Sequence, residues 1–184
     1  NFENSIIHSS EWENTAIFLN CGTNECGVSG FGSEIATNYS GDRLVVGISS
    51  DVQSFVFIYD SSASGQAGYI LSQILYEWTP SSPDNLKYYG TSIALDNCGI
   101  ILAVGAKNPY HDVSDQKVYL YKSFGTRFEQ FTLSGEYGSP EGYLTNPSIS
   151  GEPVINFGYS LAFGGTPGNT LAISAPTIHT TPDA

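Results

Sequence analysis

The stretch between residues 107 and 116 concentrates the side chains that could contact a ligand. It holds a phenol, an imidazole and two carboxylates within six residues, and such groups serve in hydrogen-bonded recognition and in weak metal binding. Two further candidates lie in the preceding connection, at 79–88. The expected ligand-binding residues are Tyr110, His111, Asp112, Asp115, Asp84 and Tyr88. The alternative is a solvated loop in which the Asp side chains cap turns.

Two of the three cysteines are expected to form a disulfide. Cys21 and Cys26 flank a loop rich in Gly and Asn, and a bridge between them closes a small ring. In the chain-entropy model such a bridge stabilises by about 2 kcal/mol. The alternative is two free thiols in a reducing compartment. Cys98 is left over, at an expected hairpin turn.

Patterns for catalysis and metal binding are weak in the sequence. No Gly-x-Ser-x-Gly motif occurs, and the glycine-rich run 164–168 lacks the Lys of a phosphate loop. The cysteines and the scattered His8, His111 and His179 match no zinc spacing. We expect no catalysis, no cofactor and no bound metal. Asn38 begins an N-glycosylation triplet, Asn-Tyr-Ser, at an expected turn, where it would be exposed.

The charge balance argues against two classes of partner. The 184 residues carry 18 Asp and Glu against 6 Lys and Arg, a net charge of −12. A field of that sign repels phosphate backbones, so nucleic acid and anionic membrane surfaces are poor partners. No run of about 18 apolar residues occurs, so no membrane span is expected. Few Lys with many Tyr, Ser, Thr and Asn resemble the composition of secreted proteins, which favours an extracellular or cell-surface location.

Three segments of the chain repeat one pattern, and this repeat indicates the fold. Each has an aromatic-Gly pair, a short apolar strand, a turn and a second apolar strand. The aromatic positions are Phe31, Tyr89 and Phe157, spaced 58 and 68 residues apart. The extra length of the second interval falls in 138–156, which is rich in Gly, Pro and Ser and is expected to be an inserted loop.

Each full repeat is expected to supply four strands. They are 31–37, 43–48, 54–60 and 69–78 in the first repeat, and 89–95, 100–106, 117–122 and 127–133 in the second. The strands at 43–48 and 54–60 are almost continuously apolar, as strands buried on both faces are. Phe2 to His8 and Trp12 to Asn20 are expected as the last two strands of a preceding unit.

An all-β chain with four-stranded antiparallel sheets of about 60 residues is what β-propeller blades require. Two full blades cannot close a ring, so we expect only part of a propeller. The expected domains are the end of a preceding blade at 1–30, a first full blade at 31–80, a second at 81–140, and a long loop with the start of a further blade at 141–184. A β-sandwich is the alternative, although sandwich strands alternate apolar and polar residues more cleanly.

The repeated motifs resemble the FG-GAP repeats of integrin-α-type β-propellers. That family pairs an aromatic-Gly opening and a hairpin turn with a Val-Gly-Ala-Pro-like strand. The matches are Phe31-Gly32 with Val46-Gly47-Ile48, Tyr89-Gly90 with Val104-Gly105-Ala106, and Phe157-Gly158 with Ile173-Ser174-Ala175-Pro176. The resemblance covers nearly the whole chain. Two departures stand out: the turns lack the carboxylates of the family's calcium loops, and the family's rings usually have seven blades.

The resemblance implies a non-catalytic segment that acts in adhesion, assembly or recognition outside the cell or at its surface. The expected partners are other chains or further blades of the same protein, and a protein or glycan ligand. Carboxylates and Tyr side chains in the loops at 79–88, 107–116 and 135–156 suit a basic or hydroxyl-rich partner. The alternatives are a structural subunit of a surface filament, coat or appendage, and the non-catalytic propeller part of a secreted hydrolase.

Overall fold

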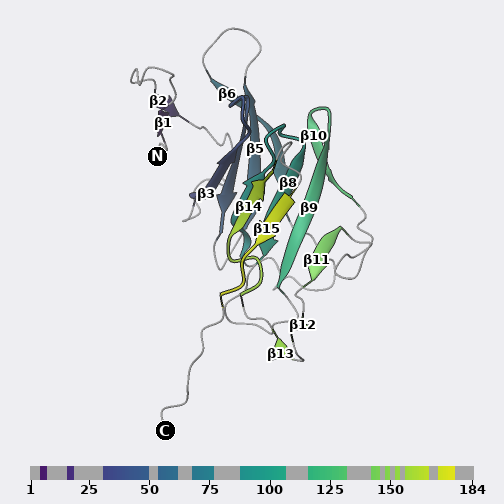
Figure 1. Ribbon diagram of the computed structural model, residues 1–184. Helices are drawn as coiled ribbons and strands as arrows, with labels where there is room; N and C mark the ends of the chain where they lie inside the picture. Colours follow the sequence, from purple (N-terminus) through teal and green to yellow (C-terminus); the bar gives the residue numbers. More distant parts are fainter. Residues whose placement is uncertain are drawn as a thin grey trace.

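The computed structural model describes most of the repeated region. The described residues are 31–49, 54–61, 68–76, 88–106, 116–131, 142–145, 156–165 and 170–176, with the backbone of four short strands at 5–7, 16–18, 148–149 and 152–153. Every regular element in them is a β-strand, which confirms the all-β prediction (Figure 1). Nothing helical in this part of the chain is long and apolar enough to cross a membrane.

The first sheet contains four antiparallel strands in chain order. They are β3 (Phe31–Thr37), β4 (Arg43–Ile48), β5 (Phe55–Ser61) and β6 (Tyr69–Leu75). The expected strands of the first repeat are confirmed, with only β6 shorter than predicted. The outer strand β6 pairs with β5 along nearly its whole length, from Val56 to Ser61 of β5.

The second sheet repeats this order but splits its outer strand. It contains β7 (Tyr89–Leu95), β8 (Ile101–Ala106), β9 (Lys117–Phe124), β10 (Arg127–Gln130) and β11 (Tyr143–Thr145). β10 pairs with the end of β9, whereas β11 pairs with its start. The prediction of an inserted loop over 138–156 is therefore wrong in part, because the start of that stretch completes the outer edge of the second sheet.

Three short hairpins complete the described strands. They are β1 (Ser5–Ile7) with β2 (Ala16–Phe18), β12 (Ser148–Ile149) with β13 (Glu152–Pro153), and β14 (Leu161–Gly164) with β15 (Thr170–Ile173). The expected pair of strands before residue 30 is confirmed as β1 and β2, although both are shorter than predicted. We call β14 and β15, which open the third repeat, the third hairpin.

The first and second sheets pack face to face, and the third hairpin packs on the opposite face of the second sheet (Figure 1). Val45 and Ile58 of the first sheet share a buried cluster with Ile93 of the second. Ala103, on the other side of the second sheet, shares a cluster with Leu161 of the third hairpin. Successive side chains of a strand point to opposite faces, so the inner strands are buried on both sides, as their apolar sequences predicted.

A tight corner opens each repeat. Gly32, Gly90 and Gly158 have φ angles of 80°, 83° and 80°, in the left-handed region that favours glycine. The corner shifts the pairing register between Phe31 and Glu34, and it does the same at the equivalent place in β7. Such a shift is a β-bulge, which bends a strand and redirects its side chains. The aromatic-Gly pair in the sequence therefore marks a corner of fixed geometry.

Two glycine contacts join successive units in the same way. A Cβ on Gly47 of β4 would lie 2.6 Å from the carbonyl oxygen of Gly90. A Cβ on Gly105 of β8 would lie 2.7 Å from the carbonyl oxygen of Gly158. Both second strands therefore need glycine where the next unit's corner approaches. We call the contact between the two sheets the first junction, and the contact between the second sheet and the third hairpin the second junction.

Candidate functional site

The two sheets present two ends with different connections. The hairpin end carries the turns 38–42 and 96–100. The loop end carries the connections that leave β4, β6 and β8, since antiparallel strands reverse direction at each connection. The Tyr39 N–H donates to the carbonyl oxygen of Asn97 at 3.1 Å, so the hairpin ends of the two sheets coincide.

Most of the predicted ligand-binding residues lie outside the described residues. These are Tyr110, His111, Asp112, Asp115 and Asp84. The described strands do fix where their segments attach. The segment between β8 and β9, and the segment between β6 and β7, both leave and return at the loop end. The two segments are thus anchored at the same end of the molecule, while the ligand contacts of their side chains stay a prediction.

Tyr88 is the predicted binding residue that the structure describes. It is half-buried with a φ of 72°, and its N–H donates to the Ser54 hydroxyl at 3.0 Å. Positive φ is uncommon outside glycine, and Asn156 adopts it at the same place before the third corner, with a φ of 63°. The backbone of Tyr88 therefore belongs to the corner of the second repeat.

Gln116 anchors the end of the predicted binding loop. Its side chain is buried, and its Oε1 accepts the Phe157 N–H at 2.7 Å. Ser54 holds the corresponding place before β5 in the first repeat, where it accepts the Tyr88 N–H. A side chain just before the third strand thus bonds the next corner in both repeats, which fixes the base of the loop end.

The cysteine predictions are tested only at Cys98. Cys21 and Cys26 lie outside the described residues, so their disulfide stays a prediction. Cys98 is exposed in the turn of the second sheet and its thiol is free, which agrees with the expectation that it pairs with neither of the others.

The predicted exposure of Asn38 is wrong. Asn38 does lie at a turn, but only 6% of its surface is exposed, because the turn of the second sheet packs against it at Gly99. Its Nδ2 donates to the Ser40 hydroxyl and, at 2.5 Å, to the Asp42 carboxylate, while its Oδ1 accepts the Arg43 N–H. A glycosylated amide keeps one hydrogen, so a glycan would cost at least one of these bonds.

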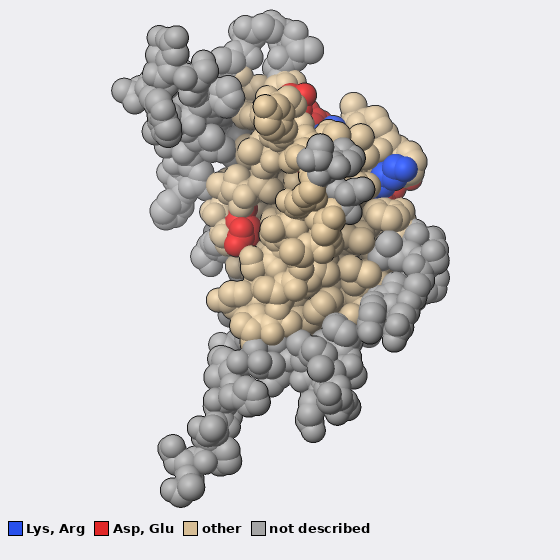
Figure 2. Space-filling view, viewed as in Figure 1, with Lys and Arg blue, Asp and Glu red and all other residues tan. Residues whose placement is uncertain are grey.

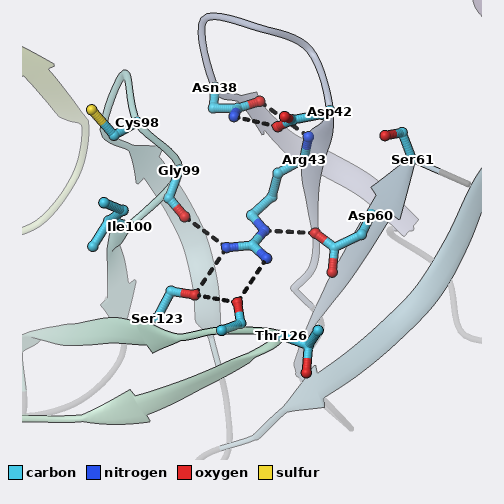
Figure 3. A pocket seen from close by; sticks show the side chains of 11 residues that line it. Asn38, Asp42, Arg43, Asp60, Ser61, Cys98, Gly99, Ile100, Ser123 and Thr126 are labelled. Carbon is cyan, nitrogen blue, oxygen red and sulfur yellow. Dashed lines mark hydrogen bonds and ion pairs between the residues drawn. The ribbon is translucent and has the colours of Figure 1, made fainter. Parts of the chain in front are cut away.

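A surface pocket of about 540 Å³ opens between the turns of the hairpin end (Figure 3). The first sheet contributes Asp42, Arg43 and Asp60 to its wall. The second sheet contributes the turn that includes Cys98 and the end of β9 at Ser123. The pocket therefore lies across the first junction.

Arg43 spans this pocket from one sheet to the other (Figure 3). Its Nε forms a 2.6 Å ion pair with Asp60, and its Nη1 donates to the carbonyl oxygen of Gly99 at 2.8 Å and to Ser123 Oγ at 3.0 Å. The guanidinium also lies over the Phe128 ring, 5.0 Å from its centroid. The Asp60 carboxylate balances its charge and four of its N–H groups have acceptors, so Arg43 joins the sheets instead of offering a free cation.

One other contact crosses the same junction, and a second contact braces the hairpin end of the first sheet. The Gln73 side chain of β6 donates to the Phe128 carbonyl at 3.0 Å and accepts the Phe128 N–H at 2.7 Å, so it joins the outer strands of the two sheets. Tyr69 donates its hydroxyl to the Gly41 carbonyl, and burial together with the Asp42 carboxylate raises the pKa of Tyr69. These groups hold the hairpin end in one geometry.

Sequence reasoning missed the role of Arg43 in joining the two sheets. One signal was available: Arg43 is the only Lys or Arg in the first 86 residues of an acidic chain. A single cation at the start of an apolar strand indicates a specific partner, because an unpaired charge beside a core is costly. Within the described residues, no three His, Cys, Asp or Glu side chains gather as metal ligands would.

Acidic and basic residues are distributed unevenly between the described residues and the rest of the sequence. Four of the six basic residues have side chains in the described part, but only five of the 18 acidic residues do. On the face shown in Figure 2, charged side chains are accordingly few among the described residues. The sequence therefore assigns most of the acidic excess to the segments between and beyond the described strands.

Comparisons with known proteins add no family: no family model matches the chain, and no curated protein matches it. The resemblance to FG-GAP repeats accordingly rests on the motifs of this sequence alone.

Proposed function

We propose that the chain is a segment of an FG-GAP-like β-propeller that recognises a protein or glycan partner through its loop end, outside the cell or at its surface. The single observation that carries the proposal is the glycine contact that recurs at both junctions. If one unit packs on the next by the same contact each time, the same rotation relates successive units. Repeating one rotation is how blades are arranged around a ring.

The two faces of each unit support this arrangement. In the second sheet, Ile93 and Val104 face the first sheet, whereas Ala94 and Ala103 face the third hairpin. The third strand follows the same order, with Tyr119 toward the first sheet and Val118 toward the third hairpin. Larger side chains toward one neighbour and smaller ones toward the other give this unit a direction. In the third hairpin, Leu161 and Ile173 pair with each other and repeat the large face, again toward the preceding unit.

The two ends of the sheets favour the loop end as the recognition surface. The hairpin end carries the short turns 38–42 and 96–100, which bond to each other and to Arg43, together with the connection between β5 and β6. The loop end instead anchors the longer connections, at 77–87 and 107–115, whose sequences carry Asp84, Tyr110 and Asp112. Carboxylates beside Tyr suit a basic or hydroxyl-rich surface, held without chemical conversion of the partner.

Binding measurements on matched variants test this proposal. The probes are immobilised neutral glycans and a cationic polylysine surface, with affinity followed as salt rises. Replacement of Tyr110 and Asp112 by Ala should weaken binding at least tenfold, and salt should weaken binding by the unaltered protein. The control is Tyr39→Ala, because Tyr39 is 91% exposed at the opposite end. If the control weakens binding as much as the pair does, the loop end is not the recognition surface.

The state of the three cysteines tests the predicted extracellular location separately. Alkylation of the denatured, unreduced protein should label one cysteine per chain, namely Cys98, which is exposed and free. Labelling of Cys21 and Cys26 would remove the argument for an oxidising compartment and leave the binding proposal to be judged separately.

A further inference from the structure

Two equivalent carbonyl oxygens at the junctions differ in their hydrogen bonds. The oxygens of Gly90 and Gly158 each approach a glycine of the preceding sheet. The Gly158 oxygen also accepts a hydrogen bond from the Ser92 hydroxyl at 2.6 Å, across the second junction. Among the described residues, no side chain donates to the Gly90 oxygen at the first junction. The first junction therefore contains an acceptor whose counterpart at the second junction is bonded.

Glu34 occupies the position in the first repeat that Ser92 occupies in the second. Both stand two residues after the corner glycine. The residue between, Ser33 or Thr91, donates its hydroxyl to the carbonyl oxygen of the second-strand glycine, at 3.2 Å and 3.3 Å respectively. The two corners are therefore built alike up to this position, and they differ in the side chain that follows.

The backbone places Glu34 beside the first junction as it places Ser92 beside the second. A Cβ on Gly47 would lie 3.6 Å from the Cβ of Glu34, and a Cβ on Gly105 would lie 3.5 Å from the Cβ of Ser92. The carbonyl oxygens of the next corners lie 2.6 Å and 2.7 Å from the same two points. Ala36, on the same face of β3, packs on the cluster that the two sheets share, so the Glu34 side chain also faces the second sheet.

A carboxyl group can replace the Ser hydroxyl as a donor in only one of its protonation states. The neutral carboxyl has one O–H group, whereas the carboxylate only accepts hydrogen bonds. Glu34 is half-buried, and this burial raises the pKa of its carboxyl above the ordinary value of 4.5. Only the neutral form of Glu34 can therefore serve as Ser92 does.

The strands packed against β3 bring no second charge to Glu34. These strands are β4 and β7, and their titratable side chains are Arg43 and Tyr89. Arg43 lies at the other end of β4, where it pairs with Asp60. The Tyr89 hydroxyl bonds to the hydroxyl of Tyr121. Within the described part of the chain, no ionised group of either strand faces Glu34.

We propose that Glu34 and Gly90 form a pH-sensitive contact at the first junction, in which the neutral carboxyl donates a hydrogen bond to the Gly90 carbonyl oxygen and the carboxylate turns to water. In acid this contact reproduces the bond that Ser92 makes at the second junction. Gly90 belongs to the corner that follows the connection 77–87, so acid stiffens the base of the loop end. The inference concerns a junction and is independent of ligand binding at the loop end.

Carbon chemical shifts in NMR test the contact directly. Because folding favours the neutral carboxyl, the contact is complete below pH 4.5 and is lost as the pH rises through the raised pKa of Glu34. The Gly90 carbonyl carbon should therefore titrate together with the Glu34 carboxyl carbon, whereas the Gly158 carbonyl carbon should not follow them. A Gly90 carbonyl carbon that does not follow Glu34 would overturn the proposal, and so would titration of Glu34 at or below pH 4.5.

Amide exchange shows whether the contact stiffens the junction. The Tyr88 N–H donates to Ser54 across the first junction, and the Phe157 N–H donates to Gln116 across the second. Between pH 7 and pH 4.5, protection of the Tyr88 amide, corrected for the intrinsic exchange rate, should rise about threefold. Protection of the Phe157 amide should stay unchanged. An equal rise at both amides would mean that acid stabilises the whole fold and that no local contact forms.

Two substitutions at Glu34 and one matched control complete the test. Glu34→Gln and Glu34→Ser each keep a donor at every pH, so the Gly90 carbonyl carbon should stop titrating and Tyr88 protection should no longer depend on pH. Glu129→Gln removes the same charge at an exposed residue of β10 and should leave both pH dependences as they are. If Glu129→Gln abolishes them as Glu34→Gln does, the effect comes from net charge and the proposed contact is wrong.

Discussion

The two junctions of this molecule are built on one backbone contact but differ in their polar contacts. Both bring a second-strand glycine against the corner of the next unit. At the first junction, Arg43 and Gln73 also reach across to the second sheet. The residue of the second sheet equivalent to Arg43 is Ile101, which is paired with Lys122. An Ile side chain has no hydrogen-bond donors, so it cannot bond to the third hairpin as Arg43 bonds to the second sheet. Instead, Ser92 donates to the Gly158 carbonyl at 2.6 Å. The glycine contact therefore defines the repeat, and the polar contacts distinguish one junction from the other.

A second difference separates the two sheets at their buried tyrosines. In the second sheet, the hydroxyls of Tyr89 and Tyr121 bond to each other at 2.6 Å. In the first sheet the same places hold Phe31 and Tyr59, so the hydroxyl that Tyr89 supplies is missing. Among the described residues the buried Tyr59 hydroxyl has no hydrogen-bond partner, and burial raises the pKa of Tyr59 to about 12. One absent oxygen atom thus leaves a buried polar group unsatisfied, which costs free energy.

Loss of the shared glycine contact should have the largest effect. Gly47→Ala would set a Cβ 2.6 Å from a backbone oxygen, which cannot move without moving the corner. We expect a loss of about 3 kcal/mol in the free energy of unfolding, and a similar loss for Gly105→Ala, by urea denaturation. Gly68→Ala is the control, because a Cβ there meets nothing within 4 Å. Equal stability of the Gly47 and Gly68 variants would show that the glycine contact does not hold the units together.

Substitution of Arg43 should weaken the first junction and leave the second junction unchanged. Arg43→Leu takes away the ion pair with Asp60 and the bonds to Gly99 and Ser123, at a cost of about 2 kcal/mol. Hydrogen exchange should speed up at the Tyr39 amide, which crosses this junction, and stay unchanged at the Phe157 amide, which bonds to Gln116 across the second junction. Arg127→Leu, at an exposed residue of β10, is the control and should change stability by less than about 0.5 kcal/mol. Faster exchange at both junctions would mean that they are not independent.

The buried tyrosines should respond in opposite directions to the same substitution. Tyr121→Phe removes the bond to Tyr89 and should cost about 1 kcal/mol. Tyr59→Phe removes a buried hydroxyl that has no partner, so stability should stay the same or rise slightly. Urea denaturation of both variants and of the unaltered protein measures the two changes in the free energy of unfolding. A loss at Tyr59 as large as the loss at Tyr121 would imply that the Tyr59 hydroxyl is bonded in solution.

The smallest effect should appear only in alkali. The neutral form of Tyr59 is favoured by folding, since its pKa rises from 10.0 to about 12. Its contribution to stability is therefore complete below pH 10 and is lost as the pH rises from 10 to 12, where the unfolded chain releases the proton first. Tyr59→Phe should make the fall in the free energy of unfolding over this pH range less steep. Between pH 7 and 9 the difference in stability between the variant and the unaltered protein should not depend on pH. Parallel pH profiles for both proteins would contradict the assigned pKa.

The sequence indicated the strands well because their signals are local. The aromatic-Gly corners, the apolar runs of β4 and β5 and the turn residues all act within a few positions of each other. The burial of Asn38 was not predictable in this way, since it depends on a turn of another sheet at Gly99. The contacts of Arg43 span 56 and 80 residues, and only the packing of one sheet on another brings them together.

The split outer strand of the second sheet shows a different limit. β11 has three residues, Tyr-Leu-Thr, within a stretch rich in Gly, Pro and Ser. Its pairing with β9 is possible because β10 ends early, after four residues, and leaves part of the β9 edge free. A strand so short has too little pattern to be recognised alone, and its position is set by the edge that it completes.

The recurrence of the glycine contact bears on how this chain can change through evolution. Removal of one whole unit, from Tyr89 to Asn156, would bring Gly47 against the corner of Gly158, a pairing that the second junction already contains in equivalent form. Removal of one strand alone would set its neighbours together without a matching corner, whereas the spacings of 58 and 68 residues between the repeats show that connections can differ in length. Related chains should therefore differ by whole repeats or by the lengths of their connections, and keep the strands of each unit together.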